Sequence, residues 1–551
     1  MIDYEHDLVK LFNERIITGL KRRTIVTPSQ WAENYRVMSP PFPGPWSFKH
    51  HPWLRGMHDS EAENNVGQKS AQMGFTETVL NIVFFNIDVN NVDCLYILPA
   101  KTPDASDFSA ARFDPAIDLS PHLKKLFSDV KNVGHKRAGN TNLYIRGSKS
   151  RSGLKSVPVG VLIFDEKDEM DQDNIPLARE RQSGHDRKIT WEISTPTIDG
   201  WGINMTFNQS TQEHFFFRCP GCNKMVDLTF PDSFEIVGED ITDIRIKESY
   251  VKCKLCHKKL EHREKTSFMI NGEWVPAQRN RDVRGFYVNQ MYSPTITPAN
   301  FIESYFKART NPADEQEFYN SKLGLPHVVE GARVTDKDLA QCYGSYGKFA
   351  ENDSGLVTMG VDVGTWLHYE IDKWHVNPNC IDINSESTCQ LISEGHVATF
   401  EELEDLMYRY QVQGVVIDMQ PERRKAFDFC QKFWGRAKMC FYGRGIQGKQ
   451  IHVHSEEELM ITVDRTSWLD MSLGRFRNKM IKLPTDLSQE YKEHIKSIVR
   501  IYEKDTDGNP VGKYVKAGSA HDHLAHARNY SEIALPLTVT IGRSQTIESV
   551  V

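Results

Sequence analysis

Short apolar runs alternate with longer polar stretches in two separate parts of the chain, and this pattern constrains the fold most. Cys94–Leu98 and Val159–Phe164 are the clearest runs in the first part, and Val357–Val363 and Gly414–Asp418 are the clearest in the second. Continuous apolar runs of this length predict buried parallel strands, whose faces must be covered by helices. The chain is therefore predicted to fold as two successive α/β units.

Further elements complete the two patterns. The residues predict strands at Ile189–Ser194 and Leu367–His375 and a helix at Glu401–Tyr410. A final helix is expected over about residues 520–534. The prolines of Met38–Trp46 predict an extended connector before the first α/β pattern.

The composition is that of a globular protein, with 39% hydrophobic and 26% charged residues, which excludes a disordered, collagen-like or coiled-coil chain. No apolar run reaches the ~18 residues of a transmembrane helix. Residues 1–10 are acidic and lack the apolar core of a secretory signal. We therefore expect a cytoplasmic protein without a membrane partner. The net charge of −7 argues against a generally basic nucleic-acid coat but leaves a nucleic-acid enzyme open.

Residues 67–77 (GQKSAQMGFTE) are a candidate phosphate loop. The usual loop reads GxxxxGK[ST], whereas here Phe75 replaces the lysine and Lys69 stands at the first glycine position. The loop wraps round the phosphates, so a lysine at its start reaches the same volume as one at its end. Gly74 keeps the turn, and Thr76 keeps the hydroxyl that binds Mg²⁺. The alternative is a simple turn before a helix.

Two further signals follow in the order that an ATPase requires. The run Val159–Phe164 ends in Asp165 and Glu166. In such motors the aspartate holds Mg²⁺ and the glutamate polarises the attacking water. Ser194 and Thr195 follow the next predicted strand, where small hydroxyl groups either sense the γ-phosphate or form a polar turn before a proline.

Four of the ten cysteines form two CxxC pairs, Cys219 with Cys222 and Cys253 with Cys256. Two such knuckles predict a tetrahedral Zn²⁺ site with four sulfur ligands. The role is predicted to be structural, because all four ligand positions are filled. A redox-active CxxC is the alternative, but it would not need two copies. The remaining cysteines are interpreted as reduced thiols.

Three acids are candidates for a nuclease centre. Asp362 and Asp418 lie at the ends of predicted strands, and Asp522 lies at the start of the final helix. Three carboxylates so placed can hold two Mg²⁺ or Mn²⁺ ions roughly 4 Å apart, as ribonuclease-H-like nucleases do. Taken singly, each aspartate is equally explained as a turn or capping residue. Other acids and histidines nearby are His521, His523, His526, Asp464 and Asp470, which either support the site or lie on the surface.

Taken together, these motifs resemble the large terminase subunit of tailed bacteriophages, in particular the lambda-type (GpA) group. The resemblance extends over about residues 30–535. It is carried by Pro43–Ser47, His51–Leu54, Gln68–Gly74, Phe164–Glu166, Ile193–Pro196, Cys219–Cys222, Gly285–Asn289, Tyr292–Pro294, Phe318–Pro326, Gly360–Gly364 and Arg465–Trp468.

The resemblance implies an ATP-driven motor that moves double-stranded viral DNA into a procapsid and an endonuclease that cuts concatemeric DNA. The family's early-placed loop lysine maps onto Lys69, and its acidic pair maps onto Asp165 and Glu166. Its coupling motif maps onto Ser194 and Thr195. Its nuclease acids map onto Asp362, Asp418 and Asp522, and its adenine contact onto the segment near Trp46.

The resemblance also implies a domain order. We expect a partner-binding segment over residues 1–30 and a P-loop ATPase domain over 31–335, with a zinc-ribbon-like insert at about 215–262. A ribonuclease-H-like domain is expected over 355–535 and a tail over 536–551. The implied partners are a small terminase subunit at the amphipathic stretch of residues 8–20 and a portal ring at the tail. Several copies of the chain would assemble when packaging.

Other classes of protein fit parts of the pattern. A helicase-like ATPase would need a second motor domain, and a ribonuclease-H-like transposase would not need Lys69 or the Asp165–Glu166 pair. A non-catalytic, zinc-stapled scaffold of the phage particle would bind neither nucleotide nor metal at the acids. The arginine that would assist ATP hydrolysis is left open among Arg112, Arg137, Arg146 and Arg151.

Overall fold

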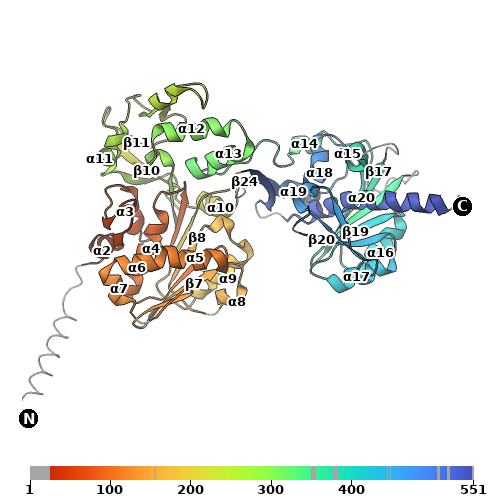
Figure 1. Ribbon diagram of the computed structural model, residues 1–551, viewed down its shortest axis with the longest axis horizontal. Helices are drawn as coiled ribbons and strands as arrows, with labels where there is room; N and C mark the ends of the chain where they lie inside the picture. The colour runs from red at the N-terminus through yellow and green to blue at the C-terminus, as the bar shows by residue number, and fades with distance from the viewer. Residues whose placement is uncertain are drawn as a thin grey trace, which may run out of the picture. The chain divides into compact units, whose positions relative to one another are not determined.

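The protein is described from a computed structural model (Figure 1). The structure describes residues 25–128, 130–155, 157–348, 355–376, 382–443, 445–446, 448–504, 509–517 and 521–548. The chain divides into a first unit, Met1–Thr310 with Glu317–Pro326, and a second unit, Asn311–Gln316 with His327–Val551. The helix predicted over residues 8–20 lies outside the described residues.

An 11-stranded sheet forms the centre of the first unit, in the order β11-β10-β15-β3-β9-β8-β4-β7-β6-β5, with β14 beside β10. Strands β10 to β7 in this order are parallel, and the edge strands are antiparallel. The parallel strands predicted from the apolar runs are thereby confirmed. The strands are β3 (Asn64–Lys69), β4 (Cys94–Leu98), β5 (Val130–Asn132), β6 (His135–Ala138), β7 (Thr141–Gly147), β8 (Val161–Asp165), β9 (Ile189–Ser194), β10 (Glu213–Arg218), β11 (Met225–Val226), β14 (Glu273–Pro276) and β15 (Val283–Val288).

Helices cover both faces of this sheet, as β4 illustrates. Tyr96 belongs to the apolar cluster that contains Val79 of α4. Leu95 and Ile97 belong to a second cluster with Leu154 of α8 on the other face. The main helices are α2 (Pro28–Tyr35), α3 (Trp53–His58), α4 (Phe75–Phe85), α6 (Asp114–Leu119), α7 (Pro121–Leu126), α8 (Arg151–Lys155), α9 (Ile175–Arg179), α10 (Gly202–Asn208), α11 (Lys265–Met269) and α12 (Pro298–Ala308).

The cysteine-bearing segment leaves the sheet at the end of β10. Residues 213–216 of β10 pair with β14, and Phe217 and Arg218 pair with β11, so the segment after residue 218 continues from the main sheet. Within the insert, β12 (Phe234–Glu235) pairs with β13 (Tyr250–Val251). Val251 and Leu260 belong to the same apolar cluster as the main sheet, so the insert shares the core of the first unit.

A mixed eight-stranded sheet forms the second unit, in the order β21-β22-β20-β19-β16-β17-β18-β23. Strands β16, β17 and β18 are antiparallel, and β19, β20 and β22 continue from β16 in parallel. The strands are β16 (Leu356–Val363), β17 (Leu367–His375), β18 (Thr388–Val397), β19 (Gly414–Asp418), β20 (Ala437–Tyr442), β21 (Ile451–Val453), β22 (Met460–Val463) and β23 (Ile481–Lys482), and a separate hairpin consists of β24 (Ile498–Lys504) and β25 (Pro510–Lys516).

Helices also cover both faces of the second sheet. Helices α16 and α17 lie on one face, where Leu403 and Phe429 share a cluster with Val361. The long helix α20 lies on the other face against β16, β17 and β19. The helices are α13 (Pro312–Glu317), α14 (Asp336–Ala340), α15 (Ile383–Glu386), α16 (Phe400–Arg409), α17 (Arg423–Lys432), α18 (Arg465–Arg477), α19 (Gln489–Ser497) and α20 (His523–Glu548).

A glycine in β16 allows α20 to lie directly on the sheet. A Cβ at Gly360 would lie 2.0 Å from the carbonyl oxygen of Ala527 and 2.2 Å from the nitrogen of Ser531, so only glycine fits. Two residues away on the same face, Thr358 Oγ1 lies 2.8 Å from Ser531 Oγ. One helical turn before Ala527, the same face of α20 carries His523 to the carboxyl end of β16.

Two predicted elements differ in the structure. Instead of a simple extended connector, Met38–Trp46 contains a small antiparallel pairing of β1 (Val37–Met38) with β2 (Gly44–Pro45). The predicted end of the last helix near residue 534 is wrong, because α20 continues past Pro536 to Glu548. The proline removes one helical hydrogen bond, but Thr538 Oγ1 donates to the carbonyl of Ala534 at 2.7 Å in the next turn. In the described part of the chain, no helix is long and apolar enough to cross a membrane.

Candidate active sites and metal centre

The candidate phosphate loop joins β3 to α4. Lys69 is the last residue of β3, and α4 begins at Phe75 after Gly74, whose φ of 84° requires a residue that tolerates the left-handed region. The first hydrogen bond of the helix runs from the Thr78 N–H to the Gly74 carbonyl at 3.1 Å. The N–H groups of the first turn therefore have no acceptor within the helix and form an anion-binding end.

The carboxyl ends of neighbouring strands bring the predicted ATPase residues together. β3, β9, β8 and β4 are successive parallel strands, so their ends share one edge of the sheet. There, Lys69 Nζ lies 2.8 Å from Oε1 of Glu166. Burial lowers the pKa of Lys69, but the charges of Glu166 and Asp165 outweigh this effect and raise it overall. Lys69 is thus held as a cation against the acidic pair.

Asp165 lies beneath this pair in a buried, polar position. Tyr96 OH donates to Oδ2 of Asp165 at 2.6 Å, and Thr76 Oγ1 lies 3.5 Å from Oδ1. Burial and the charge of Glu166 raise the pKa of Asp165 to about 6. Glu166 itself has a φ of 60°, which is uncommon for a residue with a side chain. Because of this turn, the side chains of Asp165 and Glu166 point in different directions. Asp165 contacts Tyr96 and Thr76, and Glu166 contacts Lys69.

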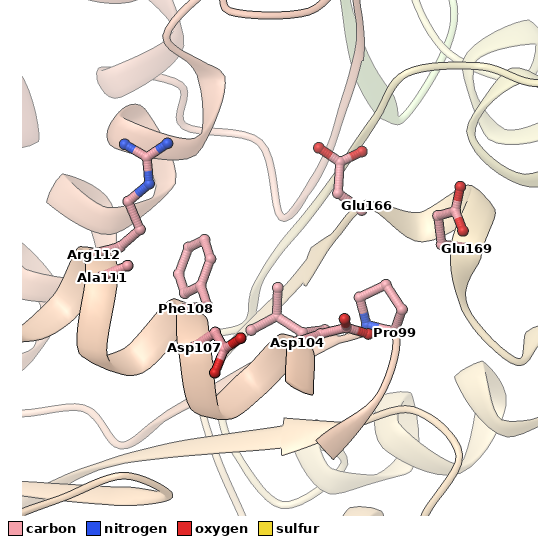
Figure 2. A pocket seen from close by; sticks show the side chains of 9 residues that line it. Pro99, Asp104, Asp107, Phe108, Ala111, Arg112, Glu166 and Glu169 are labelled. Atoms are coloured by element: carbon pink, nitrogen blue, oxygen red, sulfur yellow. The ribbon is translucent and has the colours of Figure 1, made fainter. Parts of the chain in front are cut away.

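A pocket opens beside Glu166, and Figure 2 shows the Phe108 ring between Glu166 and Arg112. Its volume is about 480 Å³. Arg112 Nη1 also lies 3.6 Å from Glu77 Oε1. Two of the other predicted arginines bond backbone carbonyls elsewhere, Arg137 that of Gly139 and Arg146 that of Gly134. The pocket is lined by Leu98, Pro99, Asp104, Asp107, Phe108, Ala111, Arg112, Glu166 and Glu169.

The segments after β8 and β9 are tied to each other. Ser194 Oγ accepts the N–H of Asp168 at 3.2 Å and donates to the carbonyl of Thr195 at 3.0 Å. Asp168 in turn accepts the N–H groups of Thr197 and Ile203, each at 2.7 Å. The predicted Ser194–Thr195 motif therefore contacts the segment that follows Glu166.

The four predicted zinc ligands meet in the insert. The Sγ atoms of Cys219, Cys222, Cys253 and Cys256 all lie within 4.8 Å of one another. The two knuckles have the same backbone bonds: Asn223 N–H to Cys219 O and His257 N–H to Cys253 O, both at 2.9 Å. The 3.8 Å between the sulfurs of Cys219 and Cys256 matches the ~3.8 Å edge of a sulfur tetrahedron around zinc. The donor set thus fits Zn²⁺.

Two of the predicted nuclease acids are neighbours across parallel strands. β16 pairs with β19 so that Val361 lies beside Ile417. Asp362 and Asp418 take the next positions, so their side chains point to the same face. Burial raises the pKa of Asp418 to about 6, and the charge of Asp362 adds to this rise. The two carboxylates therefore share a site in which a divalent cation would relieve their repulsion.

The third predicted acid, Asp522, lies just before α20 and is held by other groups. Its Oδ2 lies 3.5 Å from Nε2 of His526. Burial raises the pKa of Asp522, but His526, Lys516 and Arg465 lower it well below its ordinary value overall. Among the described residues, the three acids do not all lie within 4.8 Å of one another, and Asp362 is grouped instead with His368 and His523.

Two further acids, Asp464 and Asp470, have structural partners. Asp464 caps α18 by accepting the N–H of Ser467 at 2.8 Å. Asp470 pairs with Arg500 at 2.9 Å and accepts from Tyr514 OH at 2.8 Å. Tyr96 and His368 were not predicted as site residues, because their only signal is a polar atom within a predicted strand.

Comparison with protein families identifies this arrangement. Residues 41–274 match the model described as "Phage terminase large subunit gpA, ATPase domain", and residues 283–540 match "Terminase large subunit gpA, endonuclease domain". The chain is thus an enzyme with an ATPase domain followed by a nuclease domain. It belongs to the gpA family of phage terminase large subunits, which act on DNA in packaging and use nucleotide and divalent metal.

Solved terminase structures are also similar. The large terminase of a thermophilic bacteriophage matches with 12% identity and a TM-score of 0.32, covering 89% of this chain and 99% of that one. The Thermus phage P74-26 large terminase ATPase domain matches with 13% identity and a TM-score of 0.31, covering 49% and 92%. The magnesium-bound nuclease of phage G20c matches with 12% identity and a TM-score of 0.22, covering 35% and 94%. No curated protein matches the chain.

Proposed function

We propose that Lys69, Gly74, Thr76, Asp165, Glu166, Ser194 and Thr195 bind and hydrolyse ATP. The observation that carries this proposal is the contact of Lys69 with Glu166 at the shared strand edge. Lys69 would neutralise the β- and γ-phosphates, and the free N–H groups at the start of α4 would bind their oxygens. An arriving nucleotide would take Lys69 from Glu166 and leave that carboxylate free to polarise the attacking water.

The neighbouring groups have supporting roles in this proposal. Asp165 and Thr76 would hold the magnesium ion that accompanies ATP, whose charge stabilises the transferring phosphoryl group. Tyr96 would fix the orientation of Asp165 through its hydrogen bond. Arg112 would contact the nucleotide from the pocket that it shares with Glu166. Ser194 would transmit the state of the site along its bond to Asp168.

The second unit would cut DNA at Asp362 and Asp418, with Asp522 contributing through its position before α20. Two divalent ions supply activated water and stabilisation of the leaving oxygen in such sites. The side chains of Asp362 and Asp418 would hold these ions, since they lie on one face of neighbouring strands. The four cysteines of the insert would hold one structural Zn²⁺ ion.

The cellular role follows from these two activities. The chain would move double-stranded viral DNA into the procapsid in the host cytoplasm and cut the concatemer. A small terminase subunit would bind the segment at residues 1–30, and the portal ring would bind the tail at 536–551. The ATPase domain would extend over 31–335 and the nuclease domain over 355–535, and several copies would assemble on the portal.

The test measures ATP hydrolysis and plasmid cutting on the same preparations of the full chain. Wild type is compared with Asp362→Ala and with Glu166→Gln, and thermal melting checks that each variant is folded. We expect Asp362→Ala to lose cutting and keep hydrolysis, and Glu166→Gln to lose hydrolysis and keep cutting. If each folded variant lost both activities, the assignment of two separate sites would be wrong.

A further inference from the structure

Five imidazole rings gather around the nuclease acid Asp362, far more than two-metal chemistry through carboxylates requires. The ring of His368 lies 4.5 Å from that of His523 and 5.5 Å from that of His396. His521 stacks on His523 at 5.3 Å, and His494 lies 5.7 Å from His368. These residues come from β17, β18, α19 and residues 521–523, where α20 begins.

The strand register brings the first members of this cluster into one row. Asp362 of β16 lies directly opposite His368 of β17, and His368 lies directly opposite His396 of β18. Residues that are opposite in antiparallel strands point to the same face, about 5 Å apart. The row thus points to the face that α20 covers, and Gly360 allows α20 to bring His523 against it.

Two possible ligand sets result, and both have two histidines and one carboxylate. Asp362, His368 and His523 offer ligand atoms within 4.8 Å of one another, and so do His368, His396 and Glu490. Two imidazoles with one carboxylate form a facial ligand set that binds divalent transition metals and leaves further positions open. Both sets use His368, so a single metal ion would use only one of them.

The first set is the more completely built. Asp362 is 7% exposed and His368 is 5% exposed, and Nδ1 of His368 is buried without a hydrogen-bond partner among the described residues. Because buried polar atoms are almost always paired, this nitrogen leaves His368 with an unfilled contact. Nδ1 of His523 forms a hydrogen bond with Oδ2 of Asp362 at 2.8 Å, so the two atoms face the same space. Neighbouring ligands of an octahedral ion with bonds of about 2.1 Å are ~3.0 Å apart, so an ion could replace the proton between them with little movement.

The second set is less enclosed than the first, and the remaining histidine has another partner. The side chains of His396 and Glu490 are both about 40% exposed, and Glu490 contacts His396 Nδ1 at 3.3 Å and His368 Nε2 at 3.8 Å. The N–H of Leu524 donates to Nδ1 of His494 at 3.3 Å, which fixes that ring toward the start of α20. Nδ1 of His494 is therefore not available as a metal ligand, and His494 contributes to the cluster by packing against the other rings.

We propose that Asp362, His368 and His523 together bind one divalent transition-metal ion such as Mn²⁺. This inference rests on the proposed nuclease function and adds two nitrogen ligands to a site in which only carboxylates were expected. Mg²⁺ prefers oxygen ligands, whereas imidazole nitrogen favours the transition metals. The nuclease centre should therefore bind Mn²⁺ in the presence of a large excess of Mg²⁺, with Asp418 on the other side of Asp362.

The experiment measures Mn²⁺ binding to the full chain by the loss of the free-ion electron paramagnetic resonance signal. The protein is first loaded with zinc, so that the four cysteines of the insert are filled. Wild type is compared with His368→Ala and His523→Ala, and His396→Ala is the matched control that removes only the second ligand set. Plasmid cutting in Mg²⁺ and in Mn²⁺ is recorded on the same samples.

We expect His523→Ala and His368→Ala each to weaken Mn²⁺ binding at least 10-fold, while His396→Ala binds as wild type does. His523→Ala is the safer variant, because its side chain is 34% exposed. If His396→Ala lost the ion and His523→Ala kept it, the ion would belong to the Glu490 set and the proposal would be overturned. Unchanged Mn²⁺ binding in all three variants, with cutting retained, would overturn it and leave the nuclease function intact. A wild type that cuts DNA with neither ion would instead contradict the nuclease function itself.

Discussion

The two units neutralise their buried acids in different ways. In the ATPase unit, lysines contact two of the acids near the site: Lys69 contacts Glu166, and Lys167 contacts Glu192 at 2.7 Å. In the nuclease unit, two buried arginines pair with carboxylates of the core instead. Arg528 and Arg475 are buried beneath the sheet with three carboxylates, those of Glu370, Asp372 and Glu532.

The acids proposed for the nuclease site, Asp362 and Asp418, have imidazoles as their nearest basic groups. In the part of the chain that the structure describes, no lysine or arginine pairs with Asp362 or Asp418. A site with a fixed cation is prepared for a substrate that brings its own metal ion, as ATP does. A site with uncompensated carboxylates must attract the metal ion itself. We therefore expect the two units to differ in how their stability and activity change when a charged side chain is removed.

The largest effect is expected from the buried network of the nuclease unit. Arg528→Leu leaves the carboxylates of Glu370, Asp372 and Glu532 without their shared guanidinium. Removing one partner of a buried ion pair costs about 3–5 kcal/mol. Denaturant unfolding of the full chain should show this loss as a lower free energy of unfolding of the nuclease unit. ATP hydrolysis without denaturant should be unchanged. Arg424→Leu, which removes an exposed arginine of α17, is the control. An equal loss of stability in this variant would show that buried and surface charges do not differ in effect.

Lys69→Ala tests the fixed cation of the ATPase unit. Removing one preorganised charge that stabilises a transition state costs about 10²–10³-fold in rate. We expect this loss in ATP turnover, together with lower stability, because Glu166 and Asp165 would repel each other without the lysine. Lys101→Ala, an exposed lysine after β4, should turn over ATP as wild type does. Turnover within 3-fold of wild type in Lys69→Ala would show that another cation binds the phosphates.

Cys253→Ser tests whether the insert stabilises the unit from which it extends. Val251 and Leu260, on either side of the second knuckle, belong to the main apolar cluster of the ATPase unit. Loss of the metal should therefore lower the free energy of unfolding of that unit by more than about 2 kcal/mol. Calorimetry with metal analysis measures both quantities, and Lys247→Ala in the same insert is the control. Unchanged stability with the zinc absent would mean that the insert folds independently of metal.

The fold could be predicted from the sequence wherever a run of apolar residues is buried on both faces. β4 and β19 have the predicted bounds for this reason, and the less apolar β9 and β17 also have the predicted bounds. The approach of Lys69 to the acidic pair was also predictable, because parallel strands end at one edge. The contact between Tyr96 and Asp165 was not, since it depends on which two strands are neighbours in the sheet.

The positions of the histidines around Asp362 could likewise be predicted only in part from the sequence. Val357–Val363 and Leu367–His375 were predicted as strands, and a short connection between them would have placed His368 opposite Asp362. The further row to His396 depends on the register of β18, and the position of His523 depends on the contact of α20 with Gly360. Such packing contacts between distant segments have no local signature in the chain.

The smallest effect, and the one that separates the two sites most sharply, is expected in Asp418→Asn without metal. The amide keeps the shape of the carboxylate and removes its repulsion with Asp362, so the metal-free nuclease unit should be equally stable or more stable by up to about 1 kcal/mol. Plasmid cutting should nevertheless be lost. Lys69→Ala is predicted to change stability in the opposite direction, and calorimetry in chelator compares the two variants directly. A clear loss of stability in Asp418→Asn would mean that the nuclease acids are compensated by the protein, as those of the ATPase site are.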